Sequence, residues 1–81
     1  MYILKSISTA RYYVGYSEFP DLRLREHNSG KVKSTRLLRP WIKVYLEMYD
    51  TELLAIRREG EIKAKKSRVY IDWLIGQTRP D

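Results

Sequence analysis

The chain has 81 residues, which is room for one small domain, because a chain of this length buries only roughly 60% of its unfolded surface and cannot support a second core. It contains no cysteine, which excludes a disulfide framework and thiolate metal sites and favours a cytoplasmic protein held together by packing alone. Sixteen Lys and Arg against ten Asp and Glu give a net charge of +6, which favours a nucleic-acid partner, and no apolar run approaches the ~20 residues that cross a membrane.

Two short strands are predicted first. Residues 1–4 and 12–16 are apolar and aromatic, and a polar connection separates them, so we expect an antiparallel pair. Alternation of side chains places Tyr13 and Gly15 on the same face of the second strand. Because glycine has no side chain, Gly15 would leave room for a ligand to approach the backbone there.

A helix of about two turns is predicted next. Proline is tolerated in the first turn of a helix, so residues 19–21, with Pro20, are expected to open it, and residues 28–30, with Gly30, to close it. Residues 31–40 contain four basic residues and have no regular period. We predict an exposed loop there, with one helical turn near residues 35–38.

The third predicted strand covers residues 41–49. Its apolar residues alternate with polar and aromatic ones, so a half-buried strand is expected, with these four residues on the buried face: Ile42, Val44, Leu46 and Met48.

Two further helices complete the prediction. Asp50 or Thr51 can cap a helix that runs to about residue 65, and Ser67 can cap a last helix through residue 74, which Gly76 and Pro80 would end. The predicted fold class is α+β, with a small three-stranded antiparallel sheet flanked by about three helices in the order β-β-α-β-α-α. One domain is expected over residues 1–81, with residues 77–81 as a frayed tail.

Glu59 interrupts the apolar stripe of the second predicted helix. At 100° per residue it falls between Ile56 and Ile62, on the side expected to face the core. A carboxylate there either pairs with a nearby Lys or Arg at the edge of the stripe or binds a metal ion. Glu61 points to the opposite side and is expected to be an ordinary surface residue.

Arg23 and His27 lie four residues apart on the first predicted helix and therefore project from one face, whereas Arg25 points away. A guanidinium suits a phosphate because its planar fork donates to two oxygens in parallel. The alternative is a solvated basic face. His27, the only histidine, could equally be a cation that complements the dipole at the end of the helix.

Five polar residues occur in an order that can be compared with known families: Tyr2, Tyr13, Arg23, His27 and Glu59. With the segments His27-Asn28-Ser29-Gly30 and Arg58-Glu59-Gly60-Glu61-Ile62-Lys63, this order resembles the active-site frame of a GIY-YIG nuclease. The resemblance runs from residue 1 to about residue 75. It is closest to the small stand-alone bacterial members, which are similar to the N-terminal nuclease domain of a bacterial DNA-repair excinuclease.

The resemblance implies a metal-dependent endonuclease that hydrolyses DNA phosphodiester bonds in DNA repair or processing. Tyr13 would be the general base, and Tyr2 would orient water or phosphate. Arg23 would clamp the scissile phosphate and His27 would assist. Glu59 would be the single protein ligand of Mg²⁺ or Mn²⁺. Nearby cations would have to lower the pKa of Tyr13 for it to act as a base.

One departure from the family concerns the first motif, where Met1-Tyr2 stands in place of Gly-Ile-Tyr. It predicts a short opening strand in which Tyr2 is less firmly held. Further positive charges would follow the phosphates of a nucleic acid, and these are the predicted binding residues: Lys31, Lys33, Arg36, Arg39 and Lys63. Trp41 could stack on an unpaired base, although both tryptophans are expected in the core or at its edge.

The sequence leaves a second class of function open. A non-catalytic DNA- or RNA-binding module would keep the fold and the basic surface but would not need a metal. DNA is expected rather than RNA, with no membrane association. The sequence does not distinguish a monomer from a homodimer or a complex with another protein.

Overall fold

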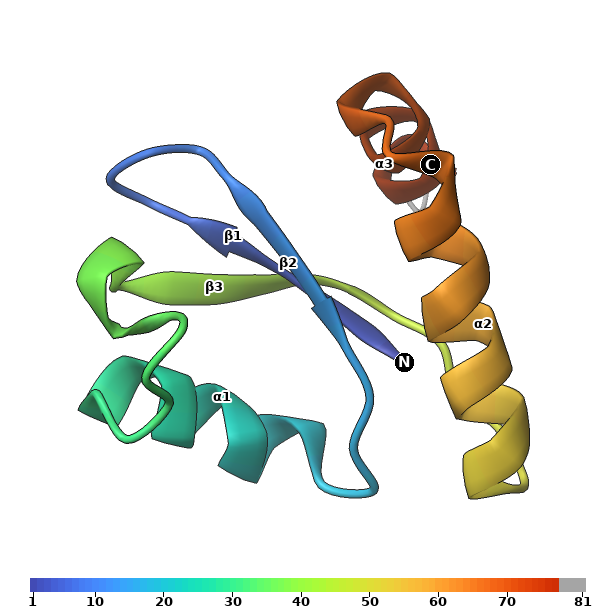
Figure 1. Cartoon of the computed structure of the whole chain (residues 1–81), viewed down its shortest axis with the longest axis horizontal. Coiled ribbons are helices and arrows are strands. Elements are labelled where there is room, and N and C mark those ends of the chain that lie inside the picture. The colour runs from blue at the N-terminus through green and yellow to red at the C-terminus, as the bar shows by residue number, and fades with distance from the viewer. Residues whose placement is uncertain (78–81) are drawn as a thin grey trace.

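A three-stranded antiparallel sheet is the centre of the fold (Figure 1). The computed structural model describes residues 1–77. Its strands are β1 (Tyr2–Ser6), β2 (Tyr12–Gly15) and β3 (Trp41–Leu46), in the spatial order β2-β1-β3. Because β1 is central, β2 and β3 are the two edges of the sheet.

Three helices and one short turn of 3₁₀ helix surround the sheet. They are α1 (Pro20–Ser29), η1 (Arg36–Leu38), α2 (Glu52–Lys65) and α3 (Arg68–Gly76). The predicted α+β class and the order β-β-α-β-α-α are confirmed, and so is the helical turn in the loop between α1 and β3. α1 has ten residues, which is nearly three turns rather than two.

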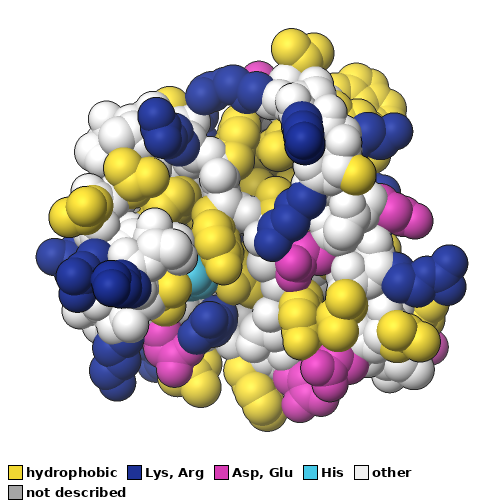
Figure 2. Space-filling model, in the orientation of Figure 1, with side chains coloured by type: hydrophobic (Ala, Val, Ile, Leu, Met, Phe, Trp, Pro, Cys, Tyr) yellow, Lys and Arg dark blue, Asp and Glu magenta, His cyan; other side chains and the backbone are white. Residues whose placement is uncertain are grey.

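Helices cover both faces of the sheet. Successive side chains of a strand point to opposite faces, so Tyr2 and Leu4 pack toward α1 and η1, whereas Ile3 packs against Ile62 of α2 and Leu74 of α3. Figure 2 shows a hollow with hydrophobic side chains at its floor, between the part formed by the sheet and α1 and the part formed by α2 and α3.

The prediction for the buried face of β3 is confirmed for Val44, which packs against the core, and is wrong for the other three residues. Trp41 and Tyr45 are buried, whereas Ile42 is 45% exposed. The pairing of β1 with β3 shifts register between Ile3 and Leu4, and such an irregularity changes which face the following side chains occupy. Trp41 therefore packs on the α1 side and Tyr45 on the α2 side. β3 also ends at residue 46, short of the predicted residue 49.

The helix ends follow the predicted capping residues. Gly30 follows α1 with φ +87°, a left-handed conformation that favours glycine. Thr51 accepts a hydrogen bond from the Leu54 amide and caps α2, and Ser67 caps α3 in the same way. α3 extends to Gly76, and the predicted roles of residues 78–81 in a frayed tail and of Pro80 as a helix stop lie outside the described residues.

Candidate active site

The hydroxyl of Tyr2 lies at the centre of the candidate site. Tyr2 is 1% exposed, and its hydroxyl lies 3.1 Å from Nε2 of His27, which is fully buried. β1 begins at Tyr2 and has five residues. The expectation that the shortened first motif leaves Tyr2 weakly held is therefore wrong, because the strand and a helix on its face both fix the side chain.

His27 links Tyr2 to the loop before β3. Nδ1 of His27 lies 2.8 Å from Oγ1 of Thr35, and Oγ1 of Thr35 also donates to the carbonyl of Val32. Since the hydroxyl proton of Thr35 is used in that bond, we assign Nδ1–H of His27 as the donor to Thr35. Nε2 then accepts from the hydroxyl of Tyr2.

His27 is therefore neutral near pH 7. Burial lowers its pKa from the ordinary value of 6.5, and the positive charge of Arg23 lowers it further. The alternative of a cationic histidine at the end of α1 does not fit this environment, although His27 does lie in the last turn of that helix.

The burial of His27 predicts a pH-dependent stability. The unfolded chain binds a proton near pH 6.5 more readily than the folded protein does, so the free energy of unfolding is expected to be highest above pH 6.5 and to fall as the pH drops below that value. Urea unfolding between pH 5.5 and 7.5 measures this effect. The chain has one histidine, so a His27→Gln variant should lose the fall below pH 6.5 and keep only the part due to the N-terminal amine, whose pKa burial lowers from 8.0. An unchanged fall below pH 6.5 would contradict the assignment.

Gly15 makes room for Tyr2 rather than for a ligand. Gly15 is paired with Tyr2 across β1 and β2, and a Cβ atom at Gly15 would lie 2.7 Å from Oη and 2.8 Å from Cζ of Tyr2. The predicted open space over the backbone at Gly15 is thus occupied by the phenol of Tyr2, and that prediction is wrong.

Replacing Gly15 with alanine is expected to lower the free energy of unfolding by about 1–3 kcal/mol, because the new methyl group overlaps a buried ring. Gly60 is the matched control, since no heavy atom lies within 4 Å of a Cβ atom there and it is inside α2. Gly60→Ala is expected to raise the stability by about 0.5–1 kcal/mol. Urea unfolding of both variants measures the difference, and equal effects would refute the packing argument.

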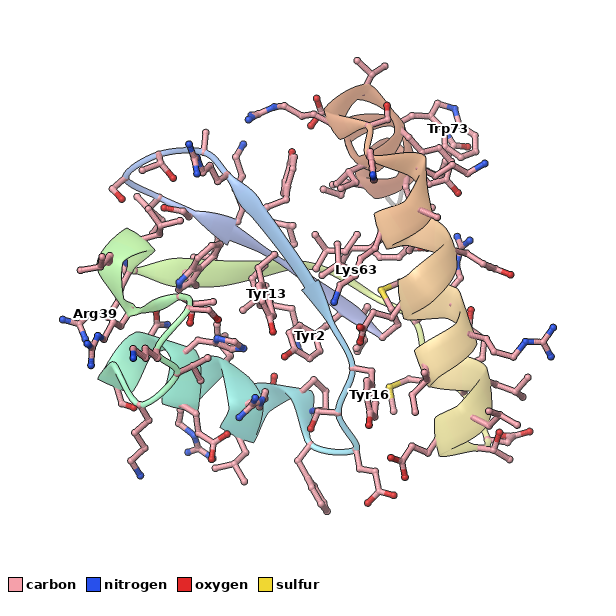
Figure 3. The ribbon with its side chains drawn as sticks, in the orientation of Figure 1. Tyr2, Tyr13, Tyr16, Arg39, Lys63 and Trp73 are labelled. Carbon is pink, nitrogen blue, oxygen red and sulfur yellow. The ribbon has the colours of Figure 1, made fainter. Side chains whose placement is uncertain are left out.

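Tyr13 presents the second phenol of the site. Its ring centroid lies 4.8 Å from that of His27, 6.5 Å from that of Tyr2 and 6.2 Å from that of Trp41. Tyr13 is only partly buried, and in Figure 3 it lies next to Tyr2, on the side away from α2. Within residues 1–77 its hydroxyl has no hydrogen-bond partner, so it is free to contact a water molecule or a substrate.

Trp41 is unavailable for stacking on a base. It is 3% exposed, and its Nε1 donates to the carbonyl of Thr35. Asn28 fixes the same residue from α1: its Oδ1 accepts from the Trp41 amide, and its Nδ2 donates to the Trp41 carbonyl. Trp73, which was also expected near the core, is 56% exposed.

Arg23 places a cation beside Tyr2. Its guanidinium interacts with the Tyr2 hydroxyl and forms an ion pair with Glu26 at 2.8 Å, and its side chain is 40% exposed. Arg25 is exposed on the other side of α1, as predicted. Burial raises the pKa of Tyr2 to about 12 despite the charge of Arg23, so this phenol remains protonated.

Glu59 completes the site from α2. Its side chain is 19% exposed, and Oε1 accepts from Nζ of Lys63 at 2.7 Å, so the predicted pairing with a nearby lysine is present. Lys63, the partner of Glu59, lines the same groove as Tyr13, and the charge of Glu59 is the smallest of the causes that shift the pKa of Tyr2. Glu61 is 60% exposed and pairs with Arg58, which confirms it as a surface residue.

Glu59 is the carboxylate of the candidate site that could bind a metal ion. In the part of the chain that the structure describes, no three His, Asp or Glu side chains form a metal-binding group. Magnesium commonly uses one or two carboxylates and takes its other ligands from water and phosphate. Glu59 fits a divalent ion as one such ligand.

The predicted nucleic-acid-binding residues are divided between two places. Lys63 lines a groove with Tyr12 and Tyr13 near the centre of the view in Figure 3, whereas Arg39 projects from the left edge. Lys31, Lys33 and Arg36 are exposed in the same segment as Arg39. Their contact with DNA stays a prediction.

Sequence reasoning missed Thr35 and Asn28 as parts of the site. Thr35 lies in a segment without a regular period, so no local signal pointed to it. Asn28 belongs to the matched segment of residues 27–30, which was a signal for its importance but not for its contact with Trp41.

The chain is similar to known proteins in two comparisons. The family model described as the GIY-YIG catalytic domain matches residues 1–71. UPF0213 proteins of Staphylococcus aureus strains Mu3, NCTC 8325 and COL are each 42% identical over 64 residues, which cover 78% of this chain and 77% of each relative. No solved structure matches the chain significantly. Among residues 1–77, no helix has the length and apolar character needed to span a membrane.

Proposed function

The chain belongs to the GIY-YIG family of nucleases, and we propose that it is a metal-dependent endonuclease that hydrolyses DNA phosphodiester bonds. We further propose DNA rather than RNA as the substrate, in DNA repair or processing. The positive net charge of the chain supports a nucleic-acid substrate.

One observation supports this proposal above the others. Tyr13 of β2 lies beside Tyr2, with ring centroids 6.5 Å apart, and the charges of Arg23 on α1 and Glu59 on α2 both influence the Tyr2 hydroxyl. A phenol, a guanidinium and a carboxylate from three elements are therefore available to the proposed site. Phosphodiester hydrolysis needs a group that takes a proton, a group that binds the phosphate and a ligand for a cation.

The side chains divide this work by their surroundings. Tyr13, whose hydroxyl has no partner within residues 1–77, would first release its proton to solvent. Its phenolate would then take a proton from the attacking water, whose oxygen forms the new bond to phosphorus while the bond to the leaving oxygen breaks and that oxygen takes a proton from solvent. Arg23 would exchange Glu26 for a phosphate oxygen and stabilise the negative charge. Tyr2, whose hydroxyl proton is donated to Nε2 of His27, would orient Arg23 by accepting from its guanidinium rather than take a proton from water.

A divalent ion would be held by Glu59, which would have to share or release its bond to Lys63. When bound, Mg²⁺ or Mn²⁺ polarises the phosphate and stabilises the leaving oxygen. Lys63 would then be released from the carboxylate and could pair with a neighbouring phosphate.

The proposal is tested by nicking of a supercoiled plasmid and of a branched oligonucleotide at low salt. Cleavage is expected with Mg²⁺ or Mn²⁺ and is expected to stop when a chelator is added. The opposite result is tight binding of both DNAs without cleavage under any metal condition. That outcome would replace the nuclease with the non-catalytic binding module.

A further inference from the structure

A groove of about 460 Å³ lies beside the candidate active site, between the edge strand β2 and the junction of α2 with α3. We refer to it as the β2 groove. It includes the hollow with a hydrophobic floor that Figure 2 shows. Its volume is in the range of sites that enclose small organic groups.

The floor of the β2 groove is apolar. Val14, Ile62 and Ile71 lie there, and the first two are 7% and 1% exposed. Tyr12 and Tyr13 of β2 add aromatic surface to the wall. Apolar and aromatic surfaces of this kind favour the flat face of a nucleobase, whatever its sequence.

The rim of the β2 groove is positively charged. Arg11, Lys63, Lys66 and Arg68 line it, and no Asp or Glu does. Lys63 pairs with Glu59, and Arg68 lies 4.0 Å from Asp72. Within the described residues, the side chains of Arg11 and Lys66 form no ion pair. An apolar floor beside unpaired cations suits a ligand that has a flat base and a phosphate.

The β2 groove is continuous with the candidate active site through two residues. Tyr13 and Lys63 line the groove, and they also lie beside Tyr2 and Glu59, respectively. In Figure 3 the side chain of Lys63 points from α2 toward β2, whereas the ring of Tyr13 lies on the α1 side of β2, against His27 and Trp41. Tyr13 therefore borders the groove and the candidate active site from the edge of the sheet. A DNA strand whose scissile phosphate lies at Arg23 and Tyr13 would therefore place an adjacent nucleotide near the β2 groove.

We propose that the β2 groove binds an unpaired nucleotide next to the scissile phosphate, so that the protein prefers single-stranded or branched DNA to intact duplex. This inference rests on the proposed nuclease function. A base inside a duplex is stacked and paired, so it cannot reach an apolar floor unless it leaves the stack. An acidic peptide paired with the edge of β2 would use the same cations, but it would not need the aromatic wall or the contact with Tyr13.

The test measures binding in a chelator, so that it does not depend on cleavage. Fluorescence anisotropy gives the Kd of the wild-type protein for a single-stranded 15-nucleotide DNA, for its duplex and for the single strand with several abasic positions. The single strand is expected to bind about tenfold more tightly than either of the other two. Equal affinity for all three would overturn the proposal even if the protein cleaves DNA.

A pair of double variants locates the preference. Arg11→Gln with Lys66→Gln removes two rim cations, and Arg25→Gln with Arg57→Gln removes two exposed cations elsewhere. The rim variant is expected to bind single-stranded DNA about tenfold more weakly. The slope of log affinity against log salt concentration should be shallower by about 1.4, since each of the two lost phosphate contacts contributes about 0.7.

The control pair should weaken single-strand and duplex binding slightly and equally. A different outcome would assign the groove to an acidic peptide. In that case the rim variant loses affinity for single-stranded and duplex DNA equally, and a poly-glutamate peptide competes with DNA for the wild-type protein. Circular dichroism shows whether the variants are folded. The comparison of the intact single strand with the abasic one uses only the wild-type protein, so it tests base binding in the groove even if a variant does not fold. If the wild-type protein prefers single-stranded DNA but nicks no DNA, the nuclease proposal is rejected and the proposal for the β2 groove stands.

Discussion

Replacing Arg23 with alanine is expected to reduce the rate of DNA cleavage by about 10²- to 10³-fold while the protein remains folded. The guanidinium lies beside Tyr2 and is the cation of α1 that faces the site. Its ion pair with Glu26 is partly exposed, and such pairs contribute only about 0–1 kcal/mol to stability. The loss should therefore appear in cleavage and not in unfolding. Single-turnover cleavage of a labelled oligonucleotide measures it.

Arg25→Ala is the matched control because it removes the same charge from the exposed side of the same helix. It is expected to change the cleavage rate by less than about threefold, through the weaker general attraction for DNA. Arg23→Lys keeps the charge but loses the planar fork, and it should recover only part of the rate. If Arg23→Ala and Arg25→Ala lose activity equally, the phosphate clamp is not at Arg23.

Replacing Glu59 with glutamine is expected to reduce cleavage at a fixed Mg²⁺ concentration by about 10²- to 10³-fold, because the substitution removes the half-buried carboxylate that is proposed to hold the ion. The rate should recover in part when the metal concentration is raised, since a neutral amide oxygen is a weaker ligand. A titration of the cleavage rate with Mg²⁺ and Mn²⁺ measures this shift.

Glu61→Gln provides the control for Glu59 because both carboxylates lie on α2 and both pair with a basic residue. Glu61 is exposed, and its replacement should leave the metal dependence unchanged. Loss of the ion pair with Lys63 should cost the Glu59→Gln variant only about 0.3–0.5 kcal/mol of stability. An unchanged metal titration for Glu59→Gln would show that another group holds the ion.

The two tyrosines differ in a way that separates their roles. Tyr2 is buried under Gly15 and His27, with a pKa of about 12, and so suits a fixed, protonated positioning group. Tyr13 is partly exposed and borders the β2 groove. The resemblance to the family implies the same division, and the different burial of the two neighbouring phenols supports it.

The sequence by itself determined the order of the helices and strands and the placement of several candidate site residues. The capping residues Thr51 and Ser67, the glycine after α1 and the spacing of Arg23 and His27 are local signals, and each acts within one or two turns of the chain. Local chemistry of this kind does not depend on the rest of the fold. The element order and the face of α1 that bears the site could therefore be predicted.

Only the tertiary structure decided the contacts between residues that are distant in the chain. The space over Gly15 is filled by a ring from another strand, and Thr35 reaches His27 from an irregular loop. The irregular pairing of β1 with β3 reversed the expected exposure of Ile42. A periodic pattern shows which residues share a face but not which neighbour will cover that face, because the neighbour is chosen by the packing of the whole chain.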